Sequence, residues 1–299
     1  MAHRTIPAAT TYRGELTTPE RWVTWEPRDG DVLVCTPPKS GTTWTQTMLA
    51  MLLNGGPDLP DTLGAVSPWV DADLGVAPDE VARTIAALPG RRVLKTHTPA
   101  DGFPVWDGIK VVAVYRHPLD IFFSLRKHIA NRHLSDDHPM KAPLSEALAA
   151  LLSEPMSKDD YDNDTLEAIT HHYLQTACSG RIPGLILLHY SDMSIDARAT
   201  LRHLADAVGI DADDALIEAI ARATGIREMR AKAERYAPVG GTGFWKSDAA
   251  FFGSGGTGNW KGQLTDNDLA AYGARLRDLV PDPGARRWLE EGSGRPFQA

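Results

Sequence analysis

Four short runs of apolar and β-branched residues are spaced along the chain, at residues 31–35, 92–96, 109–115 and 184–188. Runs of this length and composition predict buried β-strands. Helical patterns of apolar residues separate the runs, and this arrangement favours parallel pairing through crossover helices. The pattern therefore predicts an α/β fold in which an open parallel sheet is flanked by helices.

The segments between the predicted strands carry helix boundary signals. One helix is predicted over about residues 42–53, where Asn54-Gly55-Gly56 ends it, and another begins near Pro118. A longer helix is expected over about residues 164–177. From about residue 195 the pattern is mostly helical. In open α/β sheets ligands bind beyond the carboxyl ends of the strands, so the loops leaving those ends are the first place to search for a site.

A glycine-rich stretch interrupts the helical C-terminal third, between about residues 238 and 262. Such a segment is either a mobile surface loop or a lid that closes backbone amides over an anion, and composition alone leaves both open. No internal repeat and no long Pro- or Ser-rich linker divides the sequence. We therefore expect a single domain over residues 1–299 that includes this lid.

Composition narrows the function without naming it. The 299 residues include 31 Lys and Arg against 39 Asp and Glu, a formal net charge of −8, with 42% hydrophobic residues. These values are typical of a globular protein and exclude wholesale disorder. A net negative chain is a poor general binder of nucleic acid, because that affinity comes mostly from cations on phosphates. Any anion it binds must be held by a local group of residues.

Cysteine usage and the absence of targeting signals indicate a cytoplasmic protein. Cys35 and Cys178 are the two cysteines, too few and too far apart for a disulfide framework or a zinc site. The N-terminal residues lack the apolar core of a signal peptide. The apolar run at residues 48–53 is far shorter than the roughly 20 residues that span a bilayer, so no membrane span is expected.

The strongest chemical signal is the segment Pro38-Lys39-Ser40-Gly41-Thr42-Thr43-Trp44, between a predicted strand and a predicted helix. Gly41 permits a tight turn, and the amides at a helix N-terminus favour an anion. The hydroxyls add donors and Lys39 adds a mobile charge. The segment differs from the G-x-x-x-x-G-K-[ST] loop of nucleotide triphosphatases, because Lys39 precedes Gly41. Alone, it could also be a polar turn with a helix cap.

Further motifs follow in a fixed order. Arg116 ends a predicted strand and Ser124 lies eight residues later, about two turns into the next helix. The chain also contains Lys95-Thr96-His97-Thr98-Pro99, Tyr190-Ser191-Asp192-Met193, and a segment that begins with Thr224. Each of these is weak evidence by itself, since an arginine at a strand end is more often solvated or paired.

Together the motifs resemble the cytosolic-type sulfotransferase family, whose members take a sulfuryl group from 3′-phosphoadenosine 5′-phosphosulfate (PAPS) and release adenosine 3′,5′-bisphosphate. The resemblance runs from about residue 31 to residue 265. It implies a P-loop-NTPase-like open parallel sheet and no metal. The donor contacts that it implies fall on Lys39, Ser40, Gly41, Thr42, Thr43, Trp44, Arg116, Ser124, Tyr190 and Thr224.

The resemblance also assigns catalytic roles. His97 stands where the family has its base, and a histidine is mostly neutral at working pH and can accept a proton. Lys39 would stabilise charge on the bridging oxygen, and the family pattern implies that Ser124 contacts Lys39. Lys95 lies two residues before His97 in an extended segment and points to the same face. It either assists catalysis or is a solvated lysine at a strand end.

Two departures from the family pattern fall in the C-terminal part. The family's R-K-G triplet is Gly253-Ser254-Gly255 here, which leaves backbone amides and one hydroxyl to meet the donor. Each lost charged hydrogen bond costs roughly 1.5–3 kcal/mol unless another cation substitutes. An adenine-side aromatic is replaced by Ile226, and the dimer motif of animal members survives only as Lys261 and Thr265. The oligomeric state is therefore left open.

The acceptor side is expected to include Trp69, the segment 128–138 and the loop around Phe244-Trp245. Aromatic walls favour a small hydroxylated apolar acceptor, such as a phenol, an alcohol or a glycolipid. We therefore predict a PAPS-dependent sulfotransferase with His97 as its base. Two alternatives stay open: a 3′-phosphonucleotide-binding protein with little or no activity, and a P-loop-type kinase, although its Walker lysine and Mg²⁺ ligands are not evident.

Overall fold

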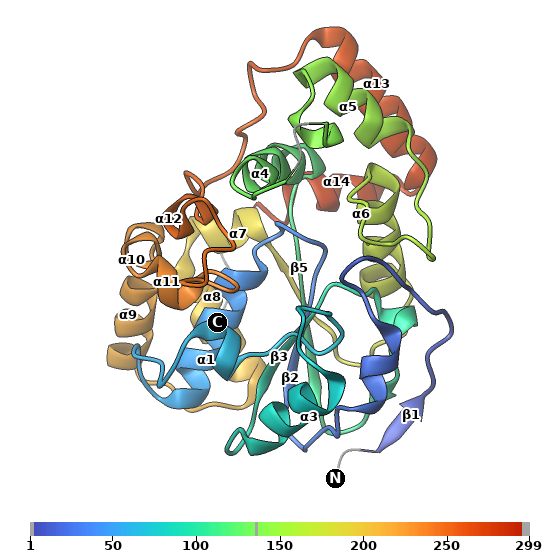
Figure 1. The fold of residues 1–299 in the computed structure, drawn as a ribbon. Coiled ribbons are helices and arrows are strands. Elements are labelled where there is room, and N and C mark those ends of the chain that lie inside the picture. The colour runs from blue at the N-terminus through green and yellow to red at the C-terminus, as the bar shows by residue number, and fades with distance from the viewer. Residues whose placement is uncertain (1–2, 135–136, 295–299) are drawn as a thin grey trace.

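A four-stranded parallel sheet lies at the centre of the computed structural model, which describes residues 3–134 and 137–294 (Figure 1). Its strands are β2 (Val32–Cys35), β3 (Val93–Thr96), β5 (Lys110–Tyr115) and β6 (Ile186–His189), in the order β3-β2-β5-β6. Each strand overlaps one of the four predicted runs. The predicted fold class, an open parallel sheet flanked by helices, is confirmed.

Three helices begin directly beyond the carboxyl ends of the strands: α1 (Thr42–Asn54) follows β2, α4 (Pro118–Ala130) follows β5, and α7 (Tyr190–Ile195) follows β6. Their N-termini therefore share one edge of the sheet, where an open α/β fold places its ligands. The other α-helices are α2 (Leu63–Val66), α3 (Pro78–Ala87), α5 (Leu144–Ser153), α6 (Leu166–Tyr173), α8 (Ala197–Val208), α9 (Asp214–Ala223), α10 (Ile226–Ala231), α11 (Ala233–Tyr236), α12 (Asp248–Phe251), α13 (Asp266–Leu279) and α14 (Pro283–Glu291).

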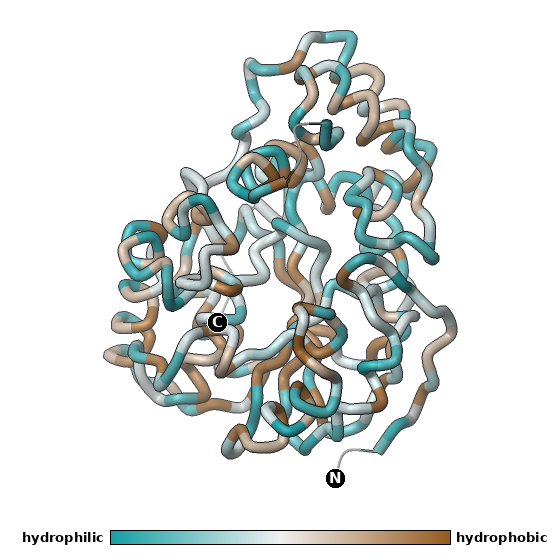
Figure 2. The backbone as a smooth tube through the Cα atoms, in the orientation of Figure 1, coloured by the Kyte–Doolittle hydropathy of each residue, from teal (hydrophilic) through white to brown (hydrophobic). Residues whose placement is uncertain are grey.

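Alternating side chains of the strands divide the core into two faces. Val32 and Val34 of β2 pack with the apolar residues of α1, α8 and α9, whereas Leu33 and Cys35 point to the opposite face. Figure 1 shows α8–α12 gathered beside α1 on one side of the sheet, and α5, α6, α13 and α14 on the other. In Figure 2 the central strands are brown with apolar residues along most of their length. Burial on both faces explains why these strands read as continuous apolar runs in the sequence.

The predicted helix over residues 164–177 is shorter and less regular than its pattern suggested. Helix α6 begins at Leu166, because the Thr165 hydroxyl accepts a hydrogen bond from the Ala168 amide at 3.1 Å and caps it. A π-helical turn continues it over Leu174–Cys178. The cap leaves Asp164 outside the helix, in the loop that leads into it.

An N-terminal layer that the strand pattern did not predict covers one edge of the sheet. Strand β1 (Arg4–Ile6) pairs antiparallel with β4 (Val105–Trp106). The 3₁₀ turn Pro19–Val23 places Trp22 against Phe103, with ring centroids 5.0 Å apart. These aromatic residues bury Leu33 and Leu94 of the central sheet.

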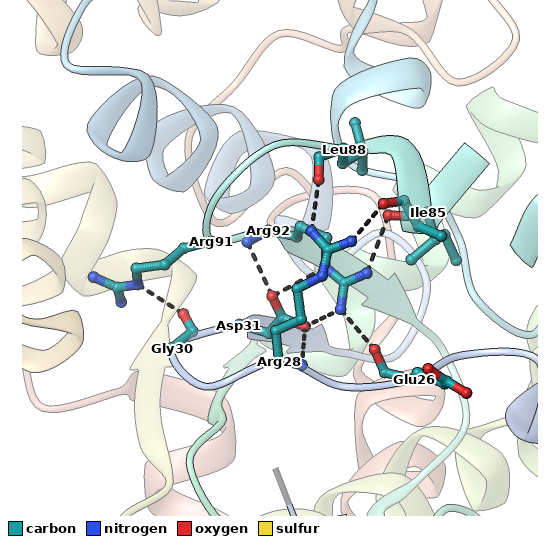
Figure 3. A network of polar contacts seen from close by, with 9 residues as sticks. Glu26, Arg28, Gly30, Asp31, Ile85, Leu88, Arg91 and Arg92 are labelled. Carbon is teal, nitrogen blue, oxygen red and sulfur yellow. Dashed lines mark hydrogen bonds and ion pairs between the residues drawn. The ribbon is translucent and has the colours of Figure 1, made fainter. Parts of the chain in front are cut away.

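A buried ion pair joins the starts of β2 and β3 (Figure 3). Asp31 is fully buried, and its carboxylate accepts hydrogen bonds from the Arg92 guanidinium, from the Arg92 amide at 3.1 Å and from the Arg28 amide at 2.9 Å. The remaining donors of Arg92 reach the carbonyls of Ile85 and Glu26 at 3.0 and 2.8 Å. Both charges are thus fully hydrogen-bonded, which is the condition under which a buried pair is tolerated.

Asp31→Ala is expected to lower the free energy of unfolding by about 3–5 kcal/mol, because it leaves the Arg92 guanidinium buried and uncompensated. Urea unfolding followed by circular dichroism measures the change. The matched control is Asp79→Ala, which removes an exposed i,i+4 partner of Arg83 and should change stability far less. Equal effects of the two substitutions would contradict the prediction.

Candidate active site

The loop between β2 and α1 turns in a way that few residues permit. Lys39 has a φ of 61° and Gly41 a φ of 115°, so two of three consecutive residues lie in the left-handed region. A Cβ atom on Gly41 would lie 3.0 Å from the Tyr190 ring and 3.4 Å from Val114. Strain of this kind at a non-glycine residue costs of order 1–3 kcal/mol and collects at functional sites.

The loop presents polar groups that have no partner of their own. Gly41 caps α1 without a side-chain hydrogen bond, so the first amides of the helix remain open. Among the described residues, the Trp44 indole N–H and Arg116 Nε are buried without a hydrogen-bond partner, and both residues line the cavity described below. The Ser40 and Thr45 hydroxyls also lack a partner, but neither residue lines that cavity. Unsatisfied buried donors are rare, and their concentration here fits an anion that is held by this loop.

Arg116 and Tyr190 come from the ends of the two neighbouring strands and meet beside the loop. The Arg116 guanidinium stacks over the Tyr190 ring at 4.4 Å and is 7% exposed. It donates a hydrogen bond to the Gly256 carbonyl at 3.0 Å and to the Lys39 carbonyl at 3.4 Å. One cation thus joins the loop after β2 to the glycine-rich segment.

The glycine-rich segment is tied to the body of the protein. The Asp120 carboxylate, at the start of α4, accepts hydrogen bonds from the amides of Gly258 and Asn259, both at 2.8 Å. Arg230 of α10 donates to the carbonyls of Phe252 and Gly253. The Arg230 guanidinium therefore supports the backbone of the segment and does not line the cavity described below. These contacts favour the lid interpretation over a mobile surface loop.

His97 follows β3 and lies next to the loop. Its Nδ1 is 2.6 Å from the Thr36 carbonyl oxygen. Because a carbonyl only accepts, Nδ1 carries the proton and Nε2 keeps its lone pair. Burial, followed by the nearby charge of Lys95, lowers the pKa of His97 well below its usual value. The ring is therefore neutral at pH 7, with a basic nitrogen available.

The segment that carries Trp69 pairs with β3 at the edge of the sheet, and this pairing holds Trp69 against His97. The backbone of residues 68–70 pairs with Lys95 through two hydrogen bonds of 3.0 Å. The Trp69 ring meets the His97 ring edge-on with centroids 4.6 Å apart, and Lys95 Nζ lies 3.9 Å above the Trp69 ring. Buried Asp71 accepts from Trp69 Nε1 at 2.8 Å and from the Thr96 and Thr98 hydroxyls. This network orients the side chains on both sides of His97.

The Lys39 ammonium contacts a helix and the lid. It donates to His128 Nδ1 at 3.2 Å and lies 4.1 Å above the Phe251 ring of α12. The contact with Ser124 that the family pattern implies is not found between these described side chains. Burial, followed by the charges of Lys95 and Arg116, lowers the pKa of Lys39 to about 7. Burial also lowers the pKa of Lys95 to about 7.

These groups face one cavity of about 650 Å³. The cavity brings together most of the sequence-predicted site residues: Lys39, Gly41, Thr42, Thr43, Trp44, Trp69, Lys95, His97, Arg116, Ser124, Tyr190, Thr224, Gly253, Ser254 and Gly255. Ser40 is the exception, because it is buried and does not line the cavity. Another part of the wall is apolar and includes Phe123, Ile129, Met140, Leu151 and Ile169.

The sequence analysis missed several residues of this site. Asp120 and Phe251 were not singled out, because their roles depend on where the lid folds back over α4. Asp164 was assigned to a helix, and its place in the cavity wall follows only from the Thr165 cap. Within the described part of the chain, no group of three or more His, Cys, Asp or Glu side chains is suited to hold a metal ion. None of the described helices has the length and apolarity needed to cross a membrane.

Comparison with known proteins gives a consistent match. The model of the family described as "Sulfotransferase domain" matches residues 29–279. A glycolipid sulfotransferase of Mycobacterium bovis is 33% identical over 311 residues, which cover 94% of each chain. A glycolipid sulfotransferase of Mycobacterium tuberculosis matches with the same identity and coverage over 310 residues.

Solved structures show the same fold at lower sequence identity. A mouse sulfotransferase complexed with PAP, the abbreviation for adenosine 3′,5′-bisphosphate, is 18% identical with a TM-score of 0.69. The match covers 91% of this chain and 92% of that one. A retinol dehydratase in a complex with retinol and PAP is 19% identical with a TM-score of 0.66, covering 86% and 83% of the two chains.

The lowered pKa values of Lys39 and Lys95 predict pH-dependent anion binding. Sulfate should raise the melting temperature more at about pH 6, where both ammonium groups are charged, than at about pH 8.5, where both are mostly neutral. Thermal unfolding in sodium sulfate, against sodium chloride of equal ionic strength, measures the difference. Lys39→Met should remove much of the pH-dependent part.

Lys110→Met is the control for this experiment, since Lys110 is exposed at the start of β5, the opposite end of that strand from Arg116. A sulfate effect that is the same at both pH values, or one that Lys110→Met reduces as much as Lys39→Met, would refute the assignment.

Proposed function

The chain belongs to the sulfotransferase family, and from its site we propose that it transfers a sulfuryl group from PAPS to a hydroxyl group of a glycolipid-type acceptor. One observation carries the proposal: a neutral histidine with a free Nε2 faces the same cavity as an anion-binding loop that bears Lys39. The named activity of the glycolipid sulfotransferases supports the acceptor class.

The residues around the cavity fit the PAPS donor. The open amides of α1 and the hydroxyls of Thr42 and Thr43 would hold the 5′-phosphosulfate, and the unpartnered Arg116 Nε would reach the 3′-phosphate. Ser124 and the amides of Gly253, Ser254 and Gly255 would add donors on the lid side. The adenine would lie among four further cavity residues: Trp44, Tyr190, Thr224 and Ile226.

When bound, the donor supplies a sulfuryl group that moves to the acceptor oxygen as the bond from sulfur to the 5′-phosphate oxygen breaks. His97 Nε2 would take the acceptor proton, while the Thr36 carbonyl holds the Nδ1 proton and stabilises the imidazolium that forms. Lys39 would neutralise the charge that develops on the leaving phosphate oxygen. Its lowered pKa fits this role, because the charge of a bound donor anion would favour the protonated form of Lys39.

The intact base separates this proposal from its alternatives. A protein that only binds a phosphonucleotide has no use for a neutral histidine with a free nitrogen beside the anion loop. A P-loop-type kinase would need a lysine placed after the second glycine of its loop and acidic Mg²⁺ ligands nearby. Lys39 instead stands two residues before Gly41.

His97→Ala is expected to lower kcat for sulfuryl transfer at least about 100-fold, the usual contribution of a general base. Affinity for adenosine 3′,5′-bisphosphate should stay close to wild type, because His97 touches the acceptor side. Transfer from radiolabelled PAPS and calorimetric titration measure the two properties. His203→Ala, on α8, controls for loss of an imidazole elsewhere. Near wild-type turnover in His97→Ala would rule out the base assignment.

Arg116→Ala should weaken adenosine 3′,5′-bisphosphate binding about tenfold or more, which is about 1.4 kcal/mol. Binding of 5′-AMP, which lacks the 3′-phosphate, should change much less. Arg227→Ala is the control, because Arg227 is exposed beside Ile226 and pairs with Glu228. If the wild-type protein binds the bisphosphate no better than 5′-AMP, the lid, which lacks the family's Arg-Lys pair, does not recognise the 3′-phosphate. That result would favour the alternative of a phosphonucleotide-binding protein with little or no activity.

A further inference from the structure

Among the buried and half-buried carboxylates that the described residues place in the cavity wall, Asp164 alone lacks a hydrogen-bond or ion-pair partner. Asp164 is half-buried and lines the cavity, and within the described chain its side chain makes no hydrogen bond and no ion pair. Its neighbours differ. Asp162 accepts three hydrogen bonds, from the Leu16 amide at 2.6 Å and from the Thr17 amide and hydroxyl at 2.9 and 2.6 Å. Asp160 accepts one from Asn163 at 2.6 Å.

The local structure leaves Asp164 free to face a ligand. The Thr165 hydroxyl already caps α6, so the helix does not use the Asp164 carboxylate. Burial, followed by the charge of Asp162, raises the pKa of Asp164 to about 7, and Lys39 partly opposes the shift. The carboxylate oxygens remain accessible from the cavity, so a ligand that excludes water from them and supplies a donor can form a charge-assisted hydrogen bond there.

The protein's own cations do not fill this role. Lys39 is close enough for its charge to favour ionised Asp164, but its ammonium contacts His128 and Phe251. Lys95 lies above the Trp69 ring, and Arg116 joins Tyr190 to the lid. The group that donates a hydrogen bond to the Asp164 carboxylate is therefore expected to belong to the acceptor molecule.

The charge of the cavity favours a neutral donor over a cationic one. An ammonium group on the acceptor would approach Lys39, Lys95 and Arg116, and the charges of the latter two already lower the pKa of Lys39. A hydroxyl group carries no such penalty. Apolar side chains in the same cavity, among them Leu74 and Phe244, which are 45% and 39% exposed, suit an aliphatic tail.

We propose that Asp164 determines acceptor specificity by accepting a hydrogen bond from a second hydroxyl of a sugar headgroup, while the reacting hydroxyl lies at His97. The acceptor is accordingly an alkyl or lipid glycoside in preference to a simple alcohol or phenol. Only the transfer step of this inference rests on the proposed function; the recognition of the sugar by Asp164 can be measured without turnover.

The first experiment compares Asp164→Ala with wild type on three acceptors that share an apolar part: octyl glucoside, 1-octanol and octylamine. Asp164→Ala should lower kcat/KM for octyl glucoside about 10- to 100-fold, the effect of removing a hydrogen bond to a charged group, and leave 1-octanol within about threefold. Asp159→Ala is the matched control, since Asp159 is an exposed carboxylate in the same loop that does not line the cavity. It should change neither acceptor appreciably.

The second experiment needs no chemistry. Calorimetric titration of octyl glucoside, below its micelle concentration, into the complex with adenosine 3′,5′-bisphosphate should show the same loss of affinity in Asp164→Ala and none in Asp159→Ala. Asp164→Asn keeps the shape of the side chain and one acceptor oxygen, so it should recover part of the affinity. If Asp164 only supported the fold, its substitution would affect all acceptors equally.

Several outcomes would overturn the inference. These are an equal loss for octyl glucoside and 1-octanol, a larger loss for octylamine, no change, or no binding of octyl glucoside to the wild-type complex. Failure of the proposed function has a different signature: the wild-type protein would transfer no sulfuryl group to any acceptor, while the Asp164-dependent binding of octyl glucoside would persist.

Discussion

The register between β2 and β3 is the constraint on which the site depends. The buried Asp31–Arg92 pair joins the two strands at their starts, where Val32 pairs with Val93. Parallel pairing then places Cys35 beside Thr96 at the other end. The next residue of each strand completes the contact, because His97 Nδ1 donates to the Thr36 carbonyl. The register of these two strands thus places the carbonyl that sets the tautomer of His97.

The second feature that determines what the cavity can bind is a group of positively charged side chains placed close together. The pKa of Lys39 is lowered by burial and by the charges of Lys95 and Arg116. The charge of Asp164 opposes this shift only in part, and the loop that carries Lys39 also leaves helix amides and an indole N–H without partners. A bound anion would satisfy all of these groups at once. The strained backbone at Lys39 is a comparable cost. The left-handed turn that it makes directs the unpartnered donors of the loop towards one point.

The sequence was most informative where burial and local geometry decide the structure. Continuous apolar runs predicted the four central strands, and Gly41 predicted a tight turn, which the structure shows with a φ of 115°. It was least informative where distant segments meet. That Lys39 contacts His128 and Phe251 depends on how the lid returns across α4. The exposure of Asp164 to the cavity depends on which residue caps α6, and periodicity alone extended that helix past Thr165.

The lid shows how a site can lose side-chain cations and remain suited to an anion. Gly255, Gly256 and Gly258 have φ values of 71°, 75° and 75°, a conformation that residues other than glycine rarely adopt. Such a backbone is costly to order, so it needs fixed supports, and the Asp120 carboxylate and the Arg230 guanidinium provide them from two different helices. Arg230 therefore stands in for the family's Arg-Lys pair only indirectly: it holds the backbone whose amides would face the donor. Arg116, which already contacts the lid through the Gly256 carbonyl, would supply the charge that a donor meets directly on this side, so under the proposed function recognition of the 3′-phosphate would depend mainly on that single guanidinium.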